Sequence, residues 1–241
     1  MKVLQVPVVV LATLTMSIAV KAQTVDEIVN KHIAAIGGKE KISAMKSIYI
    51  EADLDIQGNQ GTSINSILYG KGSLTEIELA GQKIVNCISV DKGSWSINPF
   101  AGQTTATDMP ESQANAAKSQ LQPGGALLDY AAKGNKVELA GQEDVNGVKA
   151  YKLKVVTKDG GNLTYYIDPA TFYIVKTSTK LNANGQDVEQ SVSYSDYKKT
   201  DYGFVGAYSS SIEVPGGMVI AVTVRKIEVN KEIDPKIFTK P

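Results

Sequence analysis

Residues 136–199 decide the fold, and they read KVELAGQEDVNGVKAYKLKVVTKDGGNLTYYIDPATFYIVKTSTKLNANGQDVEQSVSYSDYKK. Extended segments alternate in this stretch with turn-forming pairs at Asn146-Gly147, Asp159-Gly160, Asp168-Pro169 and Asn184-Gly185. Asn-Gly and Asp-Gly tolerate the positive φ angles of tight hairpin turns, and a proline withholds an N–H group from the strand ladder. The stretch therefore predicts an antiparallel β-meander.

Apolar and polar residues alternate between these turns. Tyr151, Leu153 and Val155 share one parity, while Lys152 and Lys154 occupy the other. Successive side chains of a strand point to opposite faces of the sheet. One face of this meander is therefore predicted to be buried and the other solvated.

The same alternation predicts strands on both sides of the central stretch. Apolar residues alternate from Ile48 to Ile56, and glycine-rich turns separate further expected strands at 62–69, 73–79, 83–90 and 94–98. Three more strands are expected at 188–197, 204–214 and 218–230. In the last of them the apolar parity changes between Val224 and Ile227, which predicts a bulge at Arg225 or Lys226.

Helices are predicted at the start of the chain and between the two groups of strands. Thr24 and Glu27 form a capping-box sequence at the start of a helix that Gly37-Gly38 ends, and a short helix is expected at 40–45. The strand pattern disappears from 99 to 135, where helices are expected from 108 to 121 and from 126 to 132. This helical insertion, near residues 104–134, is expected to cover a sheet.

The first 22 residues have the pattern of a secretory signal. Lys2 precedes an apolar run, and Ala22 occupies the small-residue position before the expected cleavage site. Residues 23–241 are then expected to form one domain. The full chain carries 25 Lys and Arg against 25 Asp and Glu, and loss of Lys2 and Lys21 leaves about two net negative charges. Nothing in this balance favours a nucleic-acid partner.

The order of these elements resembles the LolA-like family of periplasmic lipoprotein carriers, in particular the outer-membrane lipoprotein-sorting proteins of Bacteroidetes. The resemblance is carried by 35–39 (AIGGK), 95–100 (WSINPF), 125–130 (GALLDY), 148–153 (VKAYKL), 165–168 (YYID) and 227–230 (IEVN), with Ile233, Asp234 and Phe238. It implies a mainly β fold with a helical cover (α+β). The sheet is expected to be a single open, strongly curved antiparallel half-barrel, and the strand pattern predicts about 11–12 strands for it. It also implies a periplasmic location.

The resemblance and the alternating apolar face together suggest a non-enzymatic protein that binds acyl chains of lipoproteins or free lipids in a hydrophobic cavity. No cofactor or metal is expected, and the protein is expected to be a monomer. The residues expected to line the cavity are Ile50, Leu54, Leu79, Ile88, Trp95, Leu127, Leu128, Leu153, Ile167 and Val222. The alternative is an envelope protein-interaction or sensory domain that has the same scaffold and no lipid ligand.

The reactive side chains favour structural roles. His32 is the only histidine and Cys87 the only cysteine, so neither has a partner for a conventional zinc site, and no intramolecular disulfide is possible. Glu51, Asp53 and Asp55 form a carboxylate row on one face of the first strand, where a solvated surface is the simpler interpretation. A hydrolase that uses this row is the third and weakest hypothesis.

Overall fold

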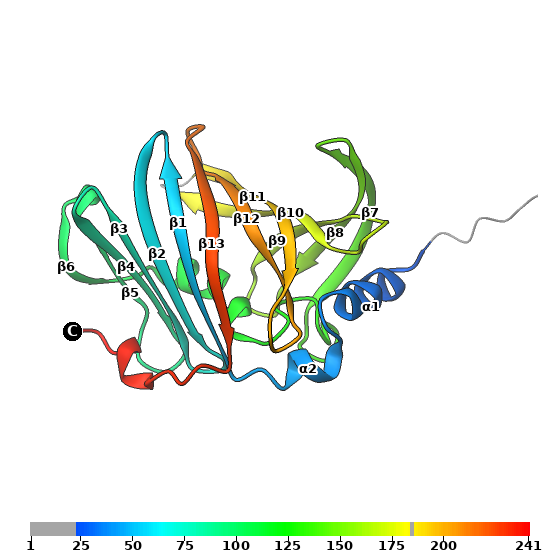
Figure 1. The fold of residues 1–241 in the computed structure, drawn as a ribbon, viewed down its shortest axis with the longest axis horizontal. Helices are drawn as coiled ribbons and strands as arrows, with labels where there is room; N and C mark the ends of the chain where they lie inside the picture. Colours follow the sequence, from blue (N-terminus) through cyan, green and yellow to red (C-terminus); the bar gives the residue numbers. More distant parts are fainter. Residues whose placement is uncertain (1–22, 184–185) are drawn as a thin grey trace, which may run out of the picture.

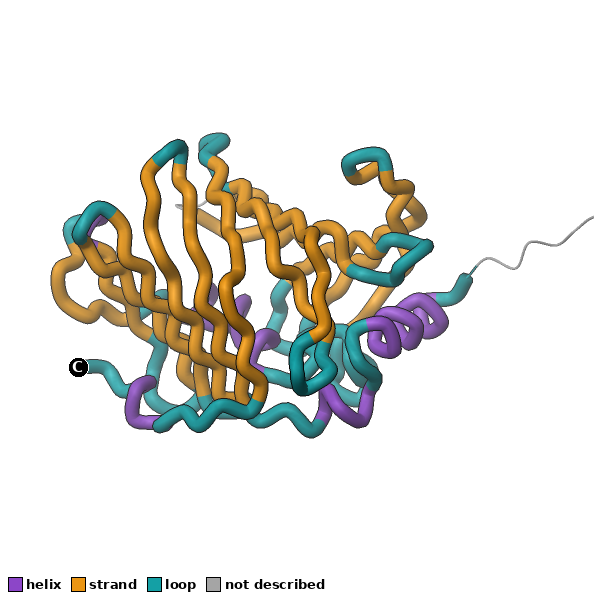
Figure 2. The backbone as a smooth tube through the Cα atoms, in the orientation of Figure 1, coloured by secondary structure: helices purple, strands orange, loops and turns teal. Residues whose placement is uncertain are grey.

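The computed structural model describes residues 23–183 and 186–241, and the predicted signal sequence lies outside this part of the chain. The described residues form one antiparallel sheet of 13 strands with short helices around it (Figures 1 and 2). The first six strands are β1 (Ser47–Ile56), β2 (Asn59–Leu68), β3 (Gly72–Leu79), β4 (Gln82–Ser89), β5 (Trp95–Asn98) and β6 (Gln103–Asp108). The other seven are β7 (Lys136–Val145), β8 (Val148–Val156), β9 (Asn162–Ile167), β10 (Ile174–Ala183), β11 (Gln186–Lys199), β12 (Val205–Glu213) and β13 (Val219–Val229). The helices are α1 (Val25–Ala35), α2 (Lys39–Ser43) and α3 (Glu111–Lys118), with 3-10 turns η1 (Pro99–Ala101), η2 (Ser119–Leu121) and η3 (Pro235–Phe238).

The N-terminal meander (β1–β6) and the C-terminal meander (β7–β13) meet where β1 pairs with β13. The strand order is β6-β5-β4-β3-β2-β1-β13-β12-β11-β10-β9-β8-β7, so β6 and β7 form the two edges. Between β1 and β13, Glu51 pairs with Lys226 and Ala52 with Val224. Arg225 is therefore the extra residue of a bulge, which confirms the sequence prediction.

Strand β6 was missed by the sequence analysis, which expected only a helical insertion there. Five of its six residues are exposed, and it pairs with β5 alone at the edge of the sheet. A strand with solvent on both faces has no hydrophobic periodicity to reveal it. This strand accounts for the difference between 13 strands and the 11–12 expected.

The helix expected at 126–132 was also a wrong prediction. Residues 123–134 form a series of turns, and we refer to 122–134 as the turn segment. Gly124, Gly125 and Asp129 have positive φ angles of 70°, 60° and 51°. A right-handed helix cannot include these conformations, so the chain turns instead.

Helix α1 begins with the predicted capping box. The Glu27 N–H donates to the Thr24 hydroxyl at 3.2 Å, and the Thr24 N–H donates to the Glu27 carboxylate at 3.1 Å. At the other end, Gly37 has a φ of 129°, and a Cβ there would lie 2.9 Å from the Gly203 carbonyl oxygen. Only glycine fits this close approach. The helix buries its apolar stripe of Ile28, Val29 and Ile33.

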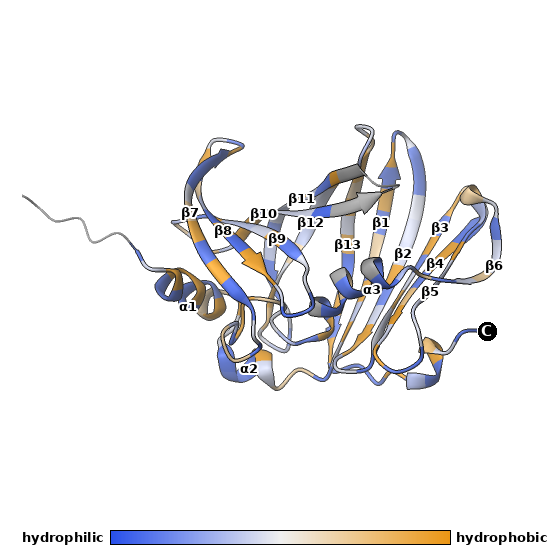
Figure 3. Cartoon of the chain, turned by 180° about the vertical axis from the view of Figure 1, so that it is seen from behind, coloured by the Kyte–Doolittle hydropathy of each residue, from blue (hydrophilic) through white to orange (hydrophobic). Residues whose placement is uncertain are grey.

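The main core lies between the helices and the concave face of the sheet. Figure 3 views the sheet from this side, with α3 in front of the central strands. Alternate strand residues pack here against α1, α2 and the turn segment. The fully buried members include Ile28, Ile42, Leu127, Leu153, Val155 and Ile167.

A second core lies on the convex face, beneath the C-terminal end of the chain. Phe238 of η3 is 2% exposed and packs against Leu74, Cys87 and Trp95. These three strand residues point away from the helices, because they alternate with residues of the concave face such as Ile88. The end of the chain thus seals the outside of the N-terminal meander.

Candidate ligand-binding cavity

A cavity of about 540 Å³ lies between the C-terminal meander and the elements that cover it. Strands β9 to β12 form its wall on the sheet side. The other wall comes from α1, α2, η2 and the turn segment, and we call these four elements together the cover. The volume is within the range of about 300–1,000 Å³ that is usual for small-molecule sites. The cavity lining includes His32, Ile42, Met45, Gln120, Gln122, Leu127, Tyr165, Thr177, Thr179, Gln190, Val192, Tyr194 and Tyr197.

The cavity wall combines buried aliphatic side chains with exposed polar ones. Ile42, Met45 and Leu127 are 1%, 4% and 1% exposed, so they form a closed, aliphatic part of the wall. Gln120 and Gln122 are exposed and mark the side that is open to solvent. A wall of this composition suits an apolar molecule that also carries a polar group.

Tyrosine side chains line the sheet side, and their hydroxyl groups already have partners. The Tyr194 and Thr177 hydroxyls lie 3.1 Å apart, and the Tyr197 O–H donates to the Ile174 carbonyl oxygen. Burial raises the pKa of Tyr165, Tyr194 and Tyr197. These rings are therefore neutral, amphipathic surfaces at any physiological pH.

His32 is the one imidazole in the wall, and it is neutral. Its Nδ1 lies 2.8 Å from the Phe172 carbonyl oxygen, and a carbonyl only accepts, so Nδ1 carries the proton. The side chain is 4% exposed. Burial lowers the pKa of His32 below its ordinary 6.5, against a smaller opposing effect of the hydrogen bond to Phe172.

This burial predicts a loss of stability on acidification. Between pH 6.5 and the lower pKa of the folded state, the unfolded chain binds a proton at His32 that the folded chain does not. The free energy of unfolding should therefore fall as the pH drops below 6.5, by up to about 1.4 kcal/mol per pH unit. Urea unfolding of the wild type and of His32→Gln at pH 7.5, 6.5 and 5.5 measures this slope. Equal slopes for the two proteins would contradict the prediction.

The cover is attached to itself and to the sheet by polar contacts. Lys39 of α2 pairs with Asp129 at 2.6 Å, and the Tyr130 O–H donates to Asp26 of α1 at 2.6 Å. The Asn135 side chain donates to the Ala126 carbonyl oxygen at 2.9 Å and accepts from the Lys158 N–H at 3.0 Å. The first two contacts are exposed and are worth less than about 1 kcal/mol each, whereas Asn135 is buried. The buried asparagine is therefore the main polar anchor of the turn segment.

The ten side chains predicted to line a cavity lie in several places. Leu127 lines the cavity described here. Leu54 and Val222 face each other across β1 and β13. Five others lie in the main core or against it: Ile50, Ile88, Leu128, Leu153 and Ile167. Trp95 lies on the convex face, where its indole N–H donates to the Phe238 carbonyl oxygen at 3.4 Å.

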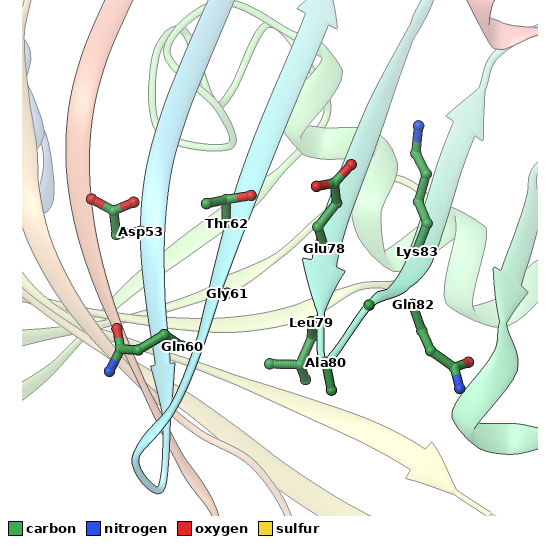
Figure 4. Close-up of a pocket in the computed structure, with 10 residues that line it drawn as sticks. Asp53, Gln60, Gly61, Thr62, Glu78, Leu79, Ala80, Gln82 and Lys83 are labelled. Atoms are coloured by element: carbon green, nitrogen blue, oxygen red, sulfur yellow. The ribbon is translucent and has the colours of Figure 1, made fainter.

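Leu79 borders a different hollow, of about 520 Å³, beside the tip of the β3–β4 hairpin (Figure 4). Asp53, Thr62 and Glu78 occupy facing positions on β1, β2 and β3, and Lys83 follows on β4. Asp53, Glu78 and Lys83 bring charge to this hollow, whereas no described residue that lines the cavity beneath the cover is charged. It is therefore less suited to an apolar ligand than the cavity beneath the cover.

The carboxylate row of the first strand is used in local contacts. Glu51 accepts from the Tyr49 hydroxyl at 2.9 Å, Asp53 lies 3.3 Å from Arg225, and Asp55 accepts from the Gly58 N–H at 2.7 Å. No group of three metal-ligating side chains occurs within 23–183 and 186–241. Cys87 is fully buried, and burial raises the pKa of its thiol to about 11. Each of the three carboxylates thus has a local partner in the described chain, and the Cys87 thiol has no access to solvent.

The sequence analysis missed the sheet side of the cavity. Thr177 shares the apolar parity of Tyr173 and Leu181 in the sequence, but Thr177, Thr179 and Gln190 are polar and were not among the residues expected to line a cavity. A useful signal was available: Val192 and Tyr194 share their parity with Gln190, and an aliphatic and an aromatic residue on one face indicate partial burial.

Comparisons with known proteins agree with this architecture. No family model and no curated protein matches the sequence. Among solved structures, a LolA superfamily protein from Nitrosomonas europaea superposes with a TM-score of 0.58 at 14% identity, over 91% of this chain and 99% of that one. The chain has the LolA-type fold. A DUF1329 family protein from Desulfovibrio piger gives a TM-score of 0.54 at 14% identity, over 90% and 98% of the two chains.

A third structure, described as an outer membrane lipoprotein-sorting protein domain from Vibrio parahaemolyticus, gives a TM-score of 0.51 at 15% identity, over 90% of this chain and 98% of that one. The LolA-type fold predicted from the sequence resemblance is thus confirmed, including the open, curved sheet with its helical cover. Among the described residues, no helix is long and apolar enough to cross a membrane.

Proposed function

We propose that this protein binds acyl chains of lipoproteins or free lipids in the cavity between the cover and the C-terminal meander. It does so as a non-enzymatic protein of the periplasm, after removal of the signal sequence, with residues 23–241 acting as a single domain. The observation that supports the proposal most directly is a cavity of about 540 Å³ whose wall combines buried aliphatic side chains with uncharged polar ones. The lipoprotein-sorting description of the Vibrio parahaemolyticus structure agrees with this ligand class.

Burial of methylene groups supplies enough free energy for such binding. Each CH₂ group removed from water contributes about 0.8 kcal/mol, so ten of them contribute about 8 kcal/mol before the loss of ligand freedom is subtracted. The aliphatic side chains of Ile42, Met45 and Leu127 provide an apolar surface for them. Micromolar affinity corresponds to about 8 kcal/mol after that subtraction, so it requires about 15 or more buried methylene groups if no charged anchor contributes.

The test has two arms. Native mass spectrometry of protein from a periplasmic extract should reveal a bound lipid, and a fluorescent fatty probe should bind the delipidated protein and be displaced by an unlabelled acyl compound. A protein that carries no lipid and ignores the probe would refute the proposal and would leave the protein-interaction hypothesis. Pull-down from envelope extracts would then be the measurement to make.

A further inference from the structure

We propose that the cavity selects acyl chains whose polar end is an uncharged ester or amide, and that it discriminates against free fatty acids. This inference rests on the proposed function, because it specifies which acyl compounds the same cavity accepts. The decisive feature is the lining: none of the described residues that form it is Lys, Arg, Asp or Glu.

The polar groups of the lining are suited to a neutral ligand. Gln120, Gln122 and Gln190 contribute side-chain amides, and Thr177 and Thr179 contribute hydroxyl groups. An amide offers both donors and an acceptor, so it can pair with the carbonyl, the hydroxyl or the N–H group of an ester or amide headgroup. The neutral His32 uses its Nδ1–H for Phe172 and adds no charge.

Among the described residues no lysine lines the cavity, and three lysines of the cover are directed to other groups. Lys133 donates to the Pro123 and Gly125 carbonyl oxygens at 3.3 and 2.8 Å. Lys39 pairs with Asp129, and the Lys31 ammonium lies 5.0 Å from the centre of the Phe172 ring. A fatty-acid carboxylate would therefore enter the cavity without a cationic partner.

An unpaired carboxylate is unfavourable in such a site. Removal of an ionised carboxylate from water is costly unless a cation or several donors compensate it, and the group otherwise takes up a proton. An ester or amide loses much less hydration and can regain its hydrogen bonds from the glutamines. Discrimination should accordingly be strongest at alkaline pH, where a fatty acid is ionised.

The first experiment compares two probes of the same chain length, monopalmitoylglycerol and palmitate, by displacement of the fluorescent probe at pH 8. We expect the glycerol ester to bind about tenfold tighter or more. At pH 6 the difference should narrow, because the fatty acid becomes partly protonated on entering the cavity. Equal binding of both compounds at pH 8 would overturn the inference and leave the proposed function intact. Binding of neither would overturn both.

Two neighbouring residues of β11 provide a matched pair of variants. Gln190 lines the cavity, whereas Ser191 points to the opposite face, where its hydroxyl donates to Glu213 at 3.4 Å. Gln190→Lys should raise the affinity for palmitate about tenfold relative to the glycerol ester, and Ser191→Lys should leave the ratio unchanged. Thr179, which pairs with Gln190 across the strands, offers Thr179→Lys as a second variant if the first does not fold. An unchanged ratio in a folded cavity variant would contradict the inference.

Discussion

Replacement of Phe238 by alanine is expected to lower the free energy of unfolding by about 3–5 kcal/mol. Phe238 is 2% exposed and fills the convex core between Leu74, Cys87 and Trp95. A Cβ on Gly72 would lie 2.9 Å from the Phe238 ring, so the backbone and the ring are in close contact. Truncation leaves a cavity that these strands cannot close. Equilibrium unfolding in urea measures the loss.

Phe100→Ala is the matched control for this variant. It removes the same side chain from η1, where Phe100 is 55% exposed, and should change the free energy of unfolding by less than about 0.5 kcal/mol. Because Phe238 lies on the face opposite to the cavity, folded Phe238→Ala should still bind the acyl probe. A loss in Phe238→Ala as small as the one expected for Phe100→Ala would show that η3 does not stabilise the N-terminal meander.

The second large effect is expected on ligand binding. Val192 lies in the cavity wall on β11, opposite Thr177 of β10. Val192→Trp should place an indole ring in the space reserved for the ligand and should weaken binding of the fluorescent fatty probe by about tenfold or more. The ring has free volume to occupy, so the melting temperature should change little. Probe titration and thermal unfolding measure the two quantities.

Ser193→Trp is the control for the cavity variant. Ser193 is the next residue of the same strand and pairs with Lys176 on the convex face. The same indole ring placed there should leave probe affinity within about twofold of the wild type. Loss of binding in both variants, or in neither, would argue against the assigned cavity.

The sequence predicted those features of the fold that depend on local patterns. Turn pairs such as Asn146-Gly147 marked the hairpins, the capping box placed the start of α1, and the change of parity beyond Val224 placed the bulge at Arg225. Each of these predictions depends only on residues that are close together in the chain, and each was confirmed. The largely exposed β6 and the positive φ angle of Asp129 could not be predicted from such local patterns.

The candidate site was less predictable, since it depends on which face of each strand is covered. The alternation of residues along the strand shows that Trp95 shares a face with other apolar residues. It does not show that η3 packs on that face and fills the space beside Trp95. Likewise, Thr177 and Gln190 have the composition of a solvated surface, and only the cover turns their face into a cavity wall. Long-range packing, which single-sequence periodicity cannot express, therefore determined the site.

The pairing of β1 with β13 also constrains how the protein can be made. Strand β1 has β2 on one side, but its other side has no partner until β13 is available. Ile48 of β1, for example, pairs with Val229 near the other end of the chain. A chain that emerges from a ribosome or a secretion channel from its N-terminus therefore carries an open β-edge for nearly the whole of its passage. Such a topology folds slowly, so biogenesis of this protein should depend on holding factors that shield the edge until translocation is complete.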